Sequence, residues 1–207
     1  LNADMLGAVM ESQSYQADAL IPLVTANQLR ASAQSYPQEV SQRYLALSDS
    51  VSQRTRILAR DLTANISNPY DKAKAIEAHL RAYPYSLNVD LPPQNRDIAD
   101  YFLFDLKTGY CDYYATSMIV LARAVGLPAR MVIGYASGIY DPTRAEYVVR
   151  EADAHSWVEI YFAEVGWVEF EPTASQPQII LPEGTPEEFT PSLLPFELDP
   201  ERGAITY

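Results

Sequence analysis

The sequence predicts an α+β fold, with helices in the first half of the chain and short antiparallel strands after them. Between about residues 50 and 125, apolar residues recur at helical spacing, and residues that favour helix caps precede them. After residue 130, short runs rich in Val, Ile, Tyr and Phe alternate with turns that contain Pro, Asp or Gly. With 207 residues, 48% of them hydrophobic, the chain is long enough to form one main domain with its own core.

Three regions are expected along the chain. Residues 1–68 should form an extended and helical subregion that packs on the core, because they mix small and polar residues with the apolar stretch Ala19 to Val24, which contains a proline. Residues 69–175 should form the main domain. Residues 176–207 are rich in proline and carry more carboxylates than basic residues, which indicates an acidic tail or linker.

Two helices are predicted before residue 88. Ser50 and Gln53 have the spacing of a capping box, and the apolar positions that follow continue a helix to about Thr63. Asn68-Pro69 then places a capping residue before a proline at the first helical position, which predicts a second helix to about Ala82.

The next part of the chain contains a loop and two more helices. Residues 88–95 include two adjacent prolines and should form a loop, whereas residues 97–106 suit a short buried helix. Gly109 ends that segment, and Cys111 should open a longer helix that ends near Val125, since a glycine and a proline follow.

Four strands are predicted after this helix, and they should pair antiparallel. Residues 141–143 and 164–166 carry Pro, Asp or Gly and provide the turns between strands. The predicted strands are Met131 to Tyr135, Glu146 to Arg150, Ser156 to Phe162 and Trp167 to Phe170.

Charge and composition exclude several classes of partner and site. A net charge of -12 argues against nucleic acid, since binding a phosphate backbone relies on Lys and Arg. One cysteine and two histidines leave little to hold a transition metal, so no cofactor is expected. No apolar run is long enough to span a bilayer, and a chain that begins with Leu1 suggests a segment of a longer protein, so membrane contact is expected only through segments outside these residues.

Cys111 and His155 have the pattern of a nucleophile and its base. A cysteine attacks carbonyl groups as a thiolate, and the start of a helix lowers the pKa of a thiol placed there. His155 lies in a run that alternates like a strand, which places it on one face with Trp157. A half-buried histidine beside an aromatic ring suits a base.

The base needs a carboxylate to orient its second ring nitrogen, and Glu171, Glu169 and Asp153 are the candidates. Asp153 and His155 are two residues apart on one strand, about 7 Å, which is awkward for a direct hydrogen bond. A residue on a paired strand can face the imidazole across about 5 Å. Glu171 is therefore preferred, and Asp153 is expected to fix the turn into the strand.

These motifs resemble the transglutaminase-like superfamily. Its pattern combines a Gly-x-Cys helix start, an Asp-x-His-x-Trp strand and a Trp-x-x-Phe-Asp-Pro-Thr strand. Here these correspond to 109–111, 153–157 and 167–173, with Glu171 in place of the usual Asp. Residues 126–135 also resemble the family's passage from helix to strand. The resemblance covers roughly Pro69 to Ser175, and residues 36–37 and 44–47 resemble bacterial members whose domain lies between transmembrane segments.

The resemblance implies a papain-like core, in which the cysteine helix packs on an antiparallel sheet that carries the histidine and the acid. It implies cysteine-dependent acyl transfer from a glutamine carboxamide of a protein or peptide to an amine, through a Cys111–His155–Glu171 triad and a thioester. An amidase or peptidase that uses the same triad is the alternative, as is a non-catalytic scaffold domain of the cell envelope. The family further implies an extracytoplasmic domain of a membrane protein.

Three aromatic residues are further candidates for the site. The backbone N–H of Cys111 should donate the first hydrogen bond to an oxyanion, and Tyr85 is the candidate for the second donor. Tyr110 is a candidate to line a cleft, although aromatic residues that flank a helix start more often belong to the core. Trp157 is expected beside the base.

Overall fold

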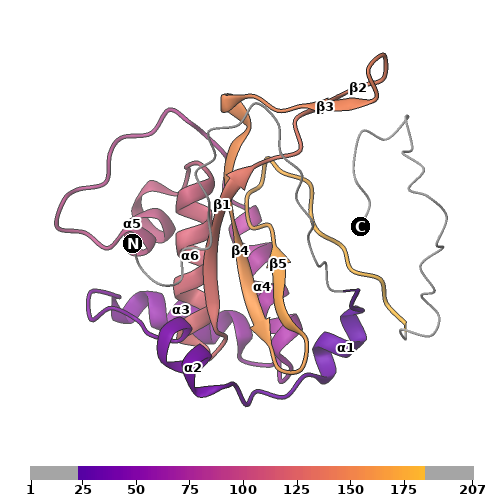
Figure 1. The fold of residues 1–207 in the computed structure, drawn as a ribbon. Helices are drawn as coiled ribbons and strands as arrows, with labels where there is room; N and C mark the ends of the chain where they lie inside the picture. Colours follow the sequence, from indigo (N-terminus) through magenta and orange to yellow (C-terminus); the bar gives the residue numbers. More distant parts are fainter. Residues whose placement is uncertain (1–22, 185–207) are drawn as a thin grey trace.

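The computed structural model describes residues 23–184 (Figure 1). Residues 1–22 and 185–207 lie outside the described residues, and so do most of the predicted extended stretch near Pro22 and most of the predicted tail. A three-stranded antiparallel sheet and the helices beside it make up the described part, which confirms the predicted α+β class.

Helices occupy most of residues 23–125, and from residue 50 on this agrees with the prediction. Two short ones in the first region, α1 and α2, had no specific prediction, and α3, α4 and α6 coincide closely with the predicted segments. The α-helices of the described residues are α1 (Ala26–Ala31), α2 (Gln38–Tyr44), α3 (Gln53–Thr63), α4 (Pro69–Arg81), α5 (Ile98–Tyr101) and α6 (Cys111–Ala124).

The caps of α3 and α4 show where the sequence pattern was right and where it was wrong. Asn68 caps α4 by accepting a hydrogen bond from the N–H of Asp71 at 2.8 Å, as predicted. The predicted cap of α3, Ser50, is wrong. Ser52 caps this helix by accepting from the N–H of Thr55, because a serine must directly precede the first helical residue to reach its free N–H groups.

The predicted helix at 97–106 is present but changes its geometry halfway. Asp97 caps α5, and the chain continues as a π-helical turn, η1 (Phe102–Leu106). The turn closes with a hydrogen bond from the N–H of Lys107 to the carbonyl of Phe102. Lys107 then adopts a left-handed conformation that ends the helix and leads toward Cys111.

The sheet has the strand order β1–β4–β5, and all its pairs are antiparallel. A separate hairpin projects beyond it at the top of Figure 1. Its first strand was missed by the sequence analysis, and its second strand pairs with that one and not with the main sheet. The strands are β1 (Ala129–Tyr135), β2 (Ile139–Asp141), β3 (Glu146–Val148), β4 (Ala154–Phe162) and β5 (Gly166–Phe170).

Helix α6 packs against one face of the sheet (Figure 1). Alternate residues of β4 face the helix and are buried, among them Val158, Ile160 and Phe162. Met118 and Leu121 of α6 are fully buried in the same core. Because α6 is fixed along its whole length by this packing, its first residue is held at one end of the sheet.

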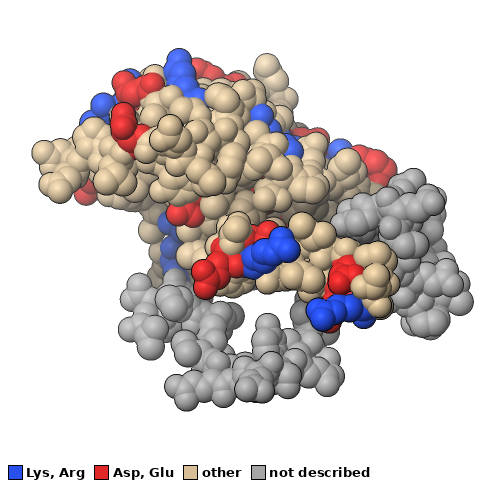
Figure 2. Space-filling view, turned by 90° about the horizontal axis from the view of Figure 1, so that it is seen from above, with Lys and Arg blue, Asp and Glu red and all other residues tan. Residues whose placement is uncertain are grey.

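Charged side chains lie in small mixed groups on the face seen from above the hairpin (Figure 2). Lys and Arg form no continuous band among the described residues visible on that face. No helix within residues 23–184 combines the length and the apolar character needed to cross a membrane.

Candidate active site

Cys111 is the first residue of α6, and close packing fixes this helix start. Tyr110 adopts the extended backbone of a cap residue and offers no side-chain hydrogen bond, and its ring contacts the ring of Tyr113 edge to face. Gly109 is needed here because a Cβ at this position would lie 2.9 Å from the ring of Tyr113 and 3.2 Å from that of Phe102. Tyr110 is partly buried against the core.

The segment around Tyr85 runs beside the approach to Cys111. The N–H of Ser86 donates to the carbonyl of Gly109 at 2.8 Å, and Thr108 donates its hydroxyl to the carbonyl of Pro84. Tyr85 therefore forms a parallel bridge with Gly109, and this residue is 38% exposed. Burial is the main cause that raises the pKa of Tyr85, and the negative charges of Cys111 and Asp112 raise it further.

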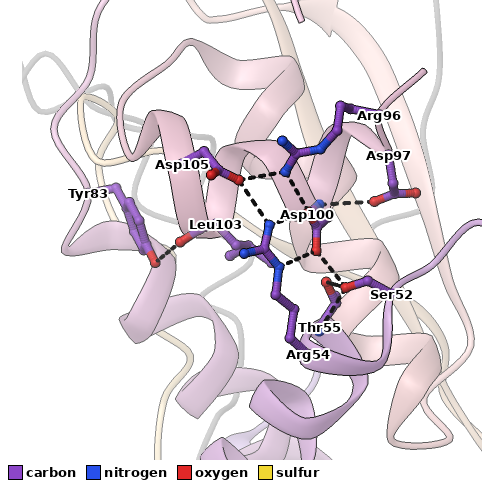
Figure 3. A network of polar contacts seen from close by, with 9 residues as sticks. All are labelled: Ser52, Arg54, Thr55, Tyr83, Arg96, Asp97, Asp100, Leu103 and Asp105. Carbon is purple, nitrogen blue, oxygen red and sulfur yellow. Dashed lines mark hydrogen bonds and ion pairs between the residues drawn. The ribbon is translucent and has the colours of Figure 1, made fainter. Parts of the chain in front are cut away.

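A network of charged side chains anchors the segment that leads into the nucleophile helix (Figure 3). Arg54 of α3 binds Asp100 through two nitrogens, at 2.7 and 2.5 Å, and reaches Asp105 of the π-helical turn. Arg96 bridges the same two carboxylates, and Ser52 also donates to Asp100. Arg54 thus ties α5 and η1 to α3, and Arg96 links α5 and η1 to each other, which fixes the start of the path to Cys111.

His155 lies near the start of β4, opposite Gly134 of β1. The ring of Trp157 stacks on the imidazole with an interplanar angle of 17° and a centroid distance of 6.1 Å. A Cβ on Gly134 would lie 3.0 Å from the Trp157 ring, so glycine leaves the space that this ring occupies. The structure therefore places Trp157 beside the histidine.

Glu171 directly follows β5, and its carboxylate faces the imidazole. The Nε2–H of His155 donates to Oε2 of Glu171 at 2.6 Å. Its other oxygen, Oε1, accepts from the N–H of Thr173 at 2.8 Å. The two rival carboxylates lie elsewhere: Asp153 accepts from the N–H of Arg150 at the turn before β4, and Glu169 is paired in register with Glu159.

Helix α4 holds the backbone that carries Glu171. The N–H of Glu171 donates to Oε1 of Glu77 at 3.0 Å, and Arg81 donates to the carbonyl of Glu171 at 2.8 Å. Arg81 also binds the carbonyls of Thr173 and Gln176. Glu77 is fully buried and pairs with Lys74, so this carboxylate has partners on both oxygens.

Ionisation of the thiol and the imidazole is coupled. Burial raises the pKa of Cys111, but hydrogen bonds with His155 and Ser156 outweigh burial and hold this pKa below its ordinary value. Burial lowers the pKa of His155, but hydrogen bonds with Cys111 and Glu171 outweigh it and raise this pKa to about 9. Both shifts favour a thiolate beside an imidazolium at neutral pH.

Two residues next to the pair were missed by the sequence analysis. Oδ1 of Asp112 lies 3.8 Å from the sulfur of Cys111. The hydroxyl of Ser156 donates to the same oxygen at 2.7 Å, which ties the start of α6 to β4. Each of these residues directly follows a predicted site residue, and only the contact between a helix and a strand far apart in sequence brings them together.

The structure thus places all six predicted site residues at one end of the sheet and of α6. His155 contacts Glu171 and is coupled to Cys111 in its ionisation, Trp157 stacks on the histidine, and Tyr85 and Tyr110 border the start of α6. Within residues 23–184, no group of three or more His, Cys, Asp or Glu side chains is arranged to hold a metal ion.

One family model and two curated proteins match this chain. The sequence model of the transglutaminase-like superfamily matches residues 56–172, which include all six of these residues. The uncharacterized protein YebA of Bacillus subtilis is 47% identical over 140 residues, which cover 64% of this chain and 19% of that protein. A Protein-glutamine gamma-glutamyltransferase of Pseudomonas aeruginosa is 36% identical over 120 residues, which cover 58% of this chain and 18% of that protein.

A solved structure shares the fold. The periplasmic domain of TgpA from Pseudomonas aeruginosa matches with a TM-score of 0.60 and 32% sequence identity, over 67% of this chain and 48% of that one. The chain spans about a fifth of the length of the two curated relatives. The predicted transglutaminase-like fold is therefore confirmed for the region that these matches cover.

Proposed function

This chain belongs to the transglutaminase-like superfamily, and we propose that it is a cysteine-dependent acyltransferase with Cys111 as nucleophile, His155 as acid–base and Glu171 as orienting acid. The observation that carries the proposal is the contact of Glu171 with Nε2 of His155, 2.6 Å, because it leaves Nδ1 for the thiol. A third group that fixes the ring in this way is the usual support of a histidine base.

The first step is attack of the Cys111 thiolate on a carboxamide carbon. As the C–S bond forms, the carbonyl oxygen takes negative charge, and the imidazolium of His155 gives its proton to the amide nitrogen. The C–N bond then breaks and ammonia leaves. The products are a thioester on Cys111 and a neutral His155, whose other nitrogen is still held by Glu171.

In the second step an amine attacks the thioester. His155 accepts a proton from the attacking nitrogen as the new C–N bond forms, and the C–S bond breaks to return the thiolate. The result is a secondary amide and the starting thiolate–imidazolium pair. If water attacks instead, the same proton transfers yield a carboxylic acid, which is the amidase or peptidase alternative.

The oxyanion of each step is assigned two donors. The N–H of Cys111 is one of the helix N–H groups that have no partner within the helix, so it is available to the developing charge. The hydroxyl of Tyr85 is assigned as the second donor, supported by the bridge of Tyr85 with Gly109, two residues before Cys111.

Proteins and peptides are the proposed substrates, with a glutamine side chain as acyl donor. Support comes from the relative named as a protein-glutamine gamma-glutamyltransferase. An extracytoplasmic location is proposed as well, since the similar structure is a periplasmic domain. The scaffold alternative does not require a thiol coupled to an imidazole, and this coupling therefore favours an enzyme.

The first test is the rate of Cys111 alkylation by iodoacetamide as a function of pH. Wild type should react rapidly below pH 8.5, the ordinary thiol pKa, and His155→Ala should be about tenfold slower or more at pH 7. His79→Ala is the matched control, because this histidine contacts Tyr83 at 3.3 Å and should leave the rate unchanged. If the wild type is alkylated slowly, with the pH dependence of an ordinary thiol, the scaffold alternative is favoured.

The second test separates transfer from hydrolysis. The protein is incubated with a glutamine peptide and a fluorescent primary amine, and mass spectrometry follows the peptide. Incorporation of the amine with loss of ammonia supports the transferase. Deamidation or cleavage of the peptide without incorporation supports the hydrolase.

A further inference from the structure

Asp112 is placed beside the nucleophile by two contacts from different parts of the fold. It is the second residue of α6, and its Oδ1 lies 3.8 Å from the sulfur of Cys111. The same oxygen accepts from the hydroxyl of Ser156, a buried residue that follows His155 on β4. A carboxylate is therefore held next to the proposed nucleophile by the strand that carries the proposed base.

Most of the other hydrogen-bonded carboxylates of residues 23–184 form an ion pair with Arg or Lys, although Asp97, Asp141, Asp153 and Glu171 do not. The carboxylates with such a partner are Asp71, Glu77, Asp100, Asp105, Glu146, Glu159 and Glu183. Asp112 is exposed and takes part in no ion pair with Lys or Arg of residues 23–184. Its negative charge faces solvent at the thiol.

A structural role alone does not account for this arrangement. An acid in the first turn of a helix is favourable to the helix dipole, which explains a carboxylate at this position. It does not explain the bond to Ser156, which directs the carboxylate toward the thiol. The charge also works against the nucleophile. Burial and the hydrogen bonds of His155 and Ser156 have the larger effects on the pKa of Cys111, and the negative charge of Asp112 raises this pKa as well.

We propose that Asp112 selects the acyl acceptor, by binding the ammonium group of a primary amine such as a lysine side chain beside the thioester. The inference rests on the proposed acyl transfer. It assigns the acyl acceptor, which is the second substrate, to the class of cationic amines. At neutral pH a lysine amine arrives protonated, since its pKa is about 10.4, so the group to be recognised is a cation. The bound ammonium releases one proton to solvent to become nucleophilic, and His155 takes the second as the amide forms.

Cys111 itself can report the charge preference of its surroundings. It is the only cysteine of the chain, so a thiol reagent labels one site. Three methanethiosulfonates of similar size carry different charges: the 2-aminoethyl reagent is a primary ammonium, the 2-sulfonatoethyl reagent an anion and the 2-hydroxyethyl reagent neutral. The ratio of their rates with one protein cancels any change in the thiolate fraction.

The wild type should react faster with the ammonium reagent, relative to the neutral one, than Asp112→Asn does. Two unit charges about 4 Å apart in water alter a rate about fivefold, and the sulfonate should respond in the opposite sense, so the cation-to-anion ratio should fall about tenfold or more in the variant. Added salt should reduce the ratio of the wild type. Asp112→Glu should retain it, and Ser156→Ala should give an intermediate value.

Glu164→Gln is the matched control. It also removes one exposed carboxylate, but at the turn that joins the far ends of β4 and β5, and it should leave the ratio unchanged. The proposal is overturned if Asp112→Asn keeps the ratio of the wild type, or if Glu164→Gln changes it equally. A variant that only loosened the helix would lower the melting temperature without altering the ratio.

This experiment needs no acyl substrate, so it separates the inference from the proposed function. If the protein shows a strong cation preference but never forms a thioester, the acidic subsite is supported and the proposed acyl transfer is contradicted. Where transfer is observed, Asp112→Asn should raise KM for a cationic diamine about fivefold and leave KM for neutral hydroxylamine unchanged. Equal changes in both KM values would refute the subsite.

Discussion

The acid half of the proposed triad and its thiol half are held in different ways. Glu171 is buried, and both its backbone groups and both its carboxylate oxygens are hydrogen-bonded within the fold. Cys111 is only half-buried, its sulfur lies 3.8 Å from Oδ1 of Asp112, and hydrogen bonding with His155 and Ser156 lowers its pKa. The acid is therefore part of the framework of the fold. The thiol remains partly open to solvent, and its neighbours set its pKa.

The largest expected effect tests this contrast directly. Cys111→Ala should reduce acyl transfer by about 10⁴-fold or more and change the free energy of unfolding by less than about 1 kcal/mol. Glu171→Ala should also suppress transfer, but it leaves His155 and the N–H of Thr173 without their acceptor and should lower the free energy of unfolding by about 2–4 kcal/mol. Urea denaturation of both variants measures this difference. Equal destabilisation by the two changes would contradict the contrast.

A second prediction extends the acid half to its support on α4. Glu77→Ala removes the acceptor of the Glu171 N–H and leaves Lys74 unpaired, so it should lower the free energy of unfolding by about 2–3 kcal/mol. Glu77→Gln keeps an acceptor oxygen and should cost less. The exposed Glu164→Gln serves as control in the same denaturation experiment, and a loss as large as that of Glu77→Ala there would refute a specific role of the buried site.

The thiol half should set the pH dependence of the reaction. Transfer requires the thiolate of Cys111 and the protonated form of His155, so kcat/KM should follow a bell-shaped profile. Its alkaline limb should lie near pH 9, because the pKa of His155 is raised to about 9, and kcat/KM should fall about tenfold per pH unit beyond it. Alkylation by iodoacetamide needs only the thiolate and should not decline there. A decline of both rates on the alkaline side would point to loss of structure.

Tyr85 gives the smallest expected effect. Tyr85→Phe removes one proposed oxyanion donor and should reduce kcat for an amide substrate about tenfold or more. Iodoacetamide alkylation forms no oxyanion and should change less than about twofold. Tyr140→Phe, in the β2–β3 hairpin, is the matched control and should alter neither rate. A parallel loss of both rates in Tyr85→Phe would show that Tyr85 acts on the thiolate and not on the oxyanion.

Local signals made much of this architecture predictable. Helix α4 carries a capping asparagine, a proline at its first position and an apolar stripe, so neighbouring residues suffice to define it. Strand β2 is three residues long and exists through its pairing with β3, and short segments of this kind give little signal of their own. Helices α1 and α2 are also short, six and seven residues, and helices of this length depend on the rest of the fold.

The site was predictable where chemistry is concentrated in one motif. Cys111 and His155 stand out because the chain has one cysteine and two histidines. Glu77 had a signal that was not used: it lies on the apolar face of α4, between Ala73 and Leu80, where a charged residue needs a buried partner. The contact of Asp112 with Ser156 had none, since it joins residues 44 positions apart.

The segment after Glu171 also has a mechanical consequence. It runs back along α4 to α1, where the carbonyl of Pro182 accepts from the N–H of Ala26. A pull on the chain near residue 184 would be transmitted along this segment toward the triad carboxylate. Between these two points Arg81 binds the carbonyls of Thr173 and Gln176, and it also binds the carbonyl of Glu171 itself. A load applied at residue 184 should therefore meet the Pro182–Ala26 bond and the bonds of Arg81 before it moves the carboxylate that faces His155.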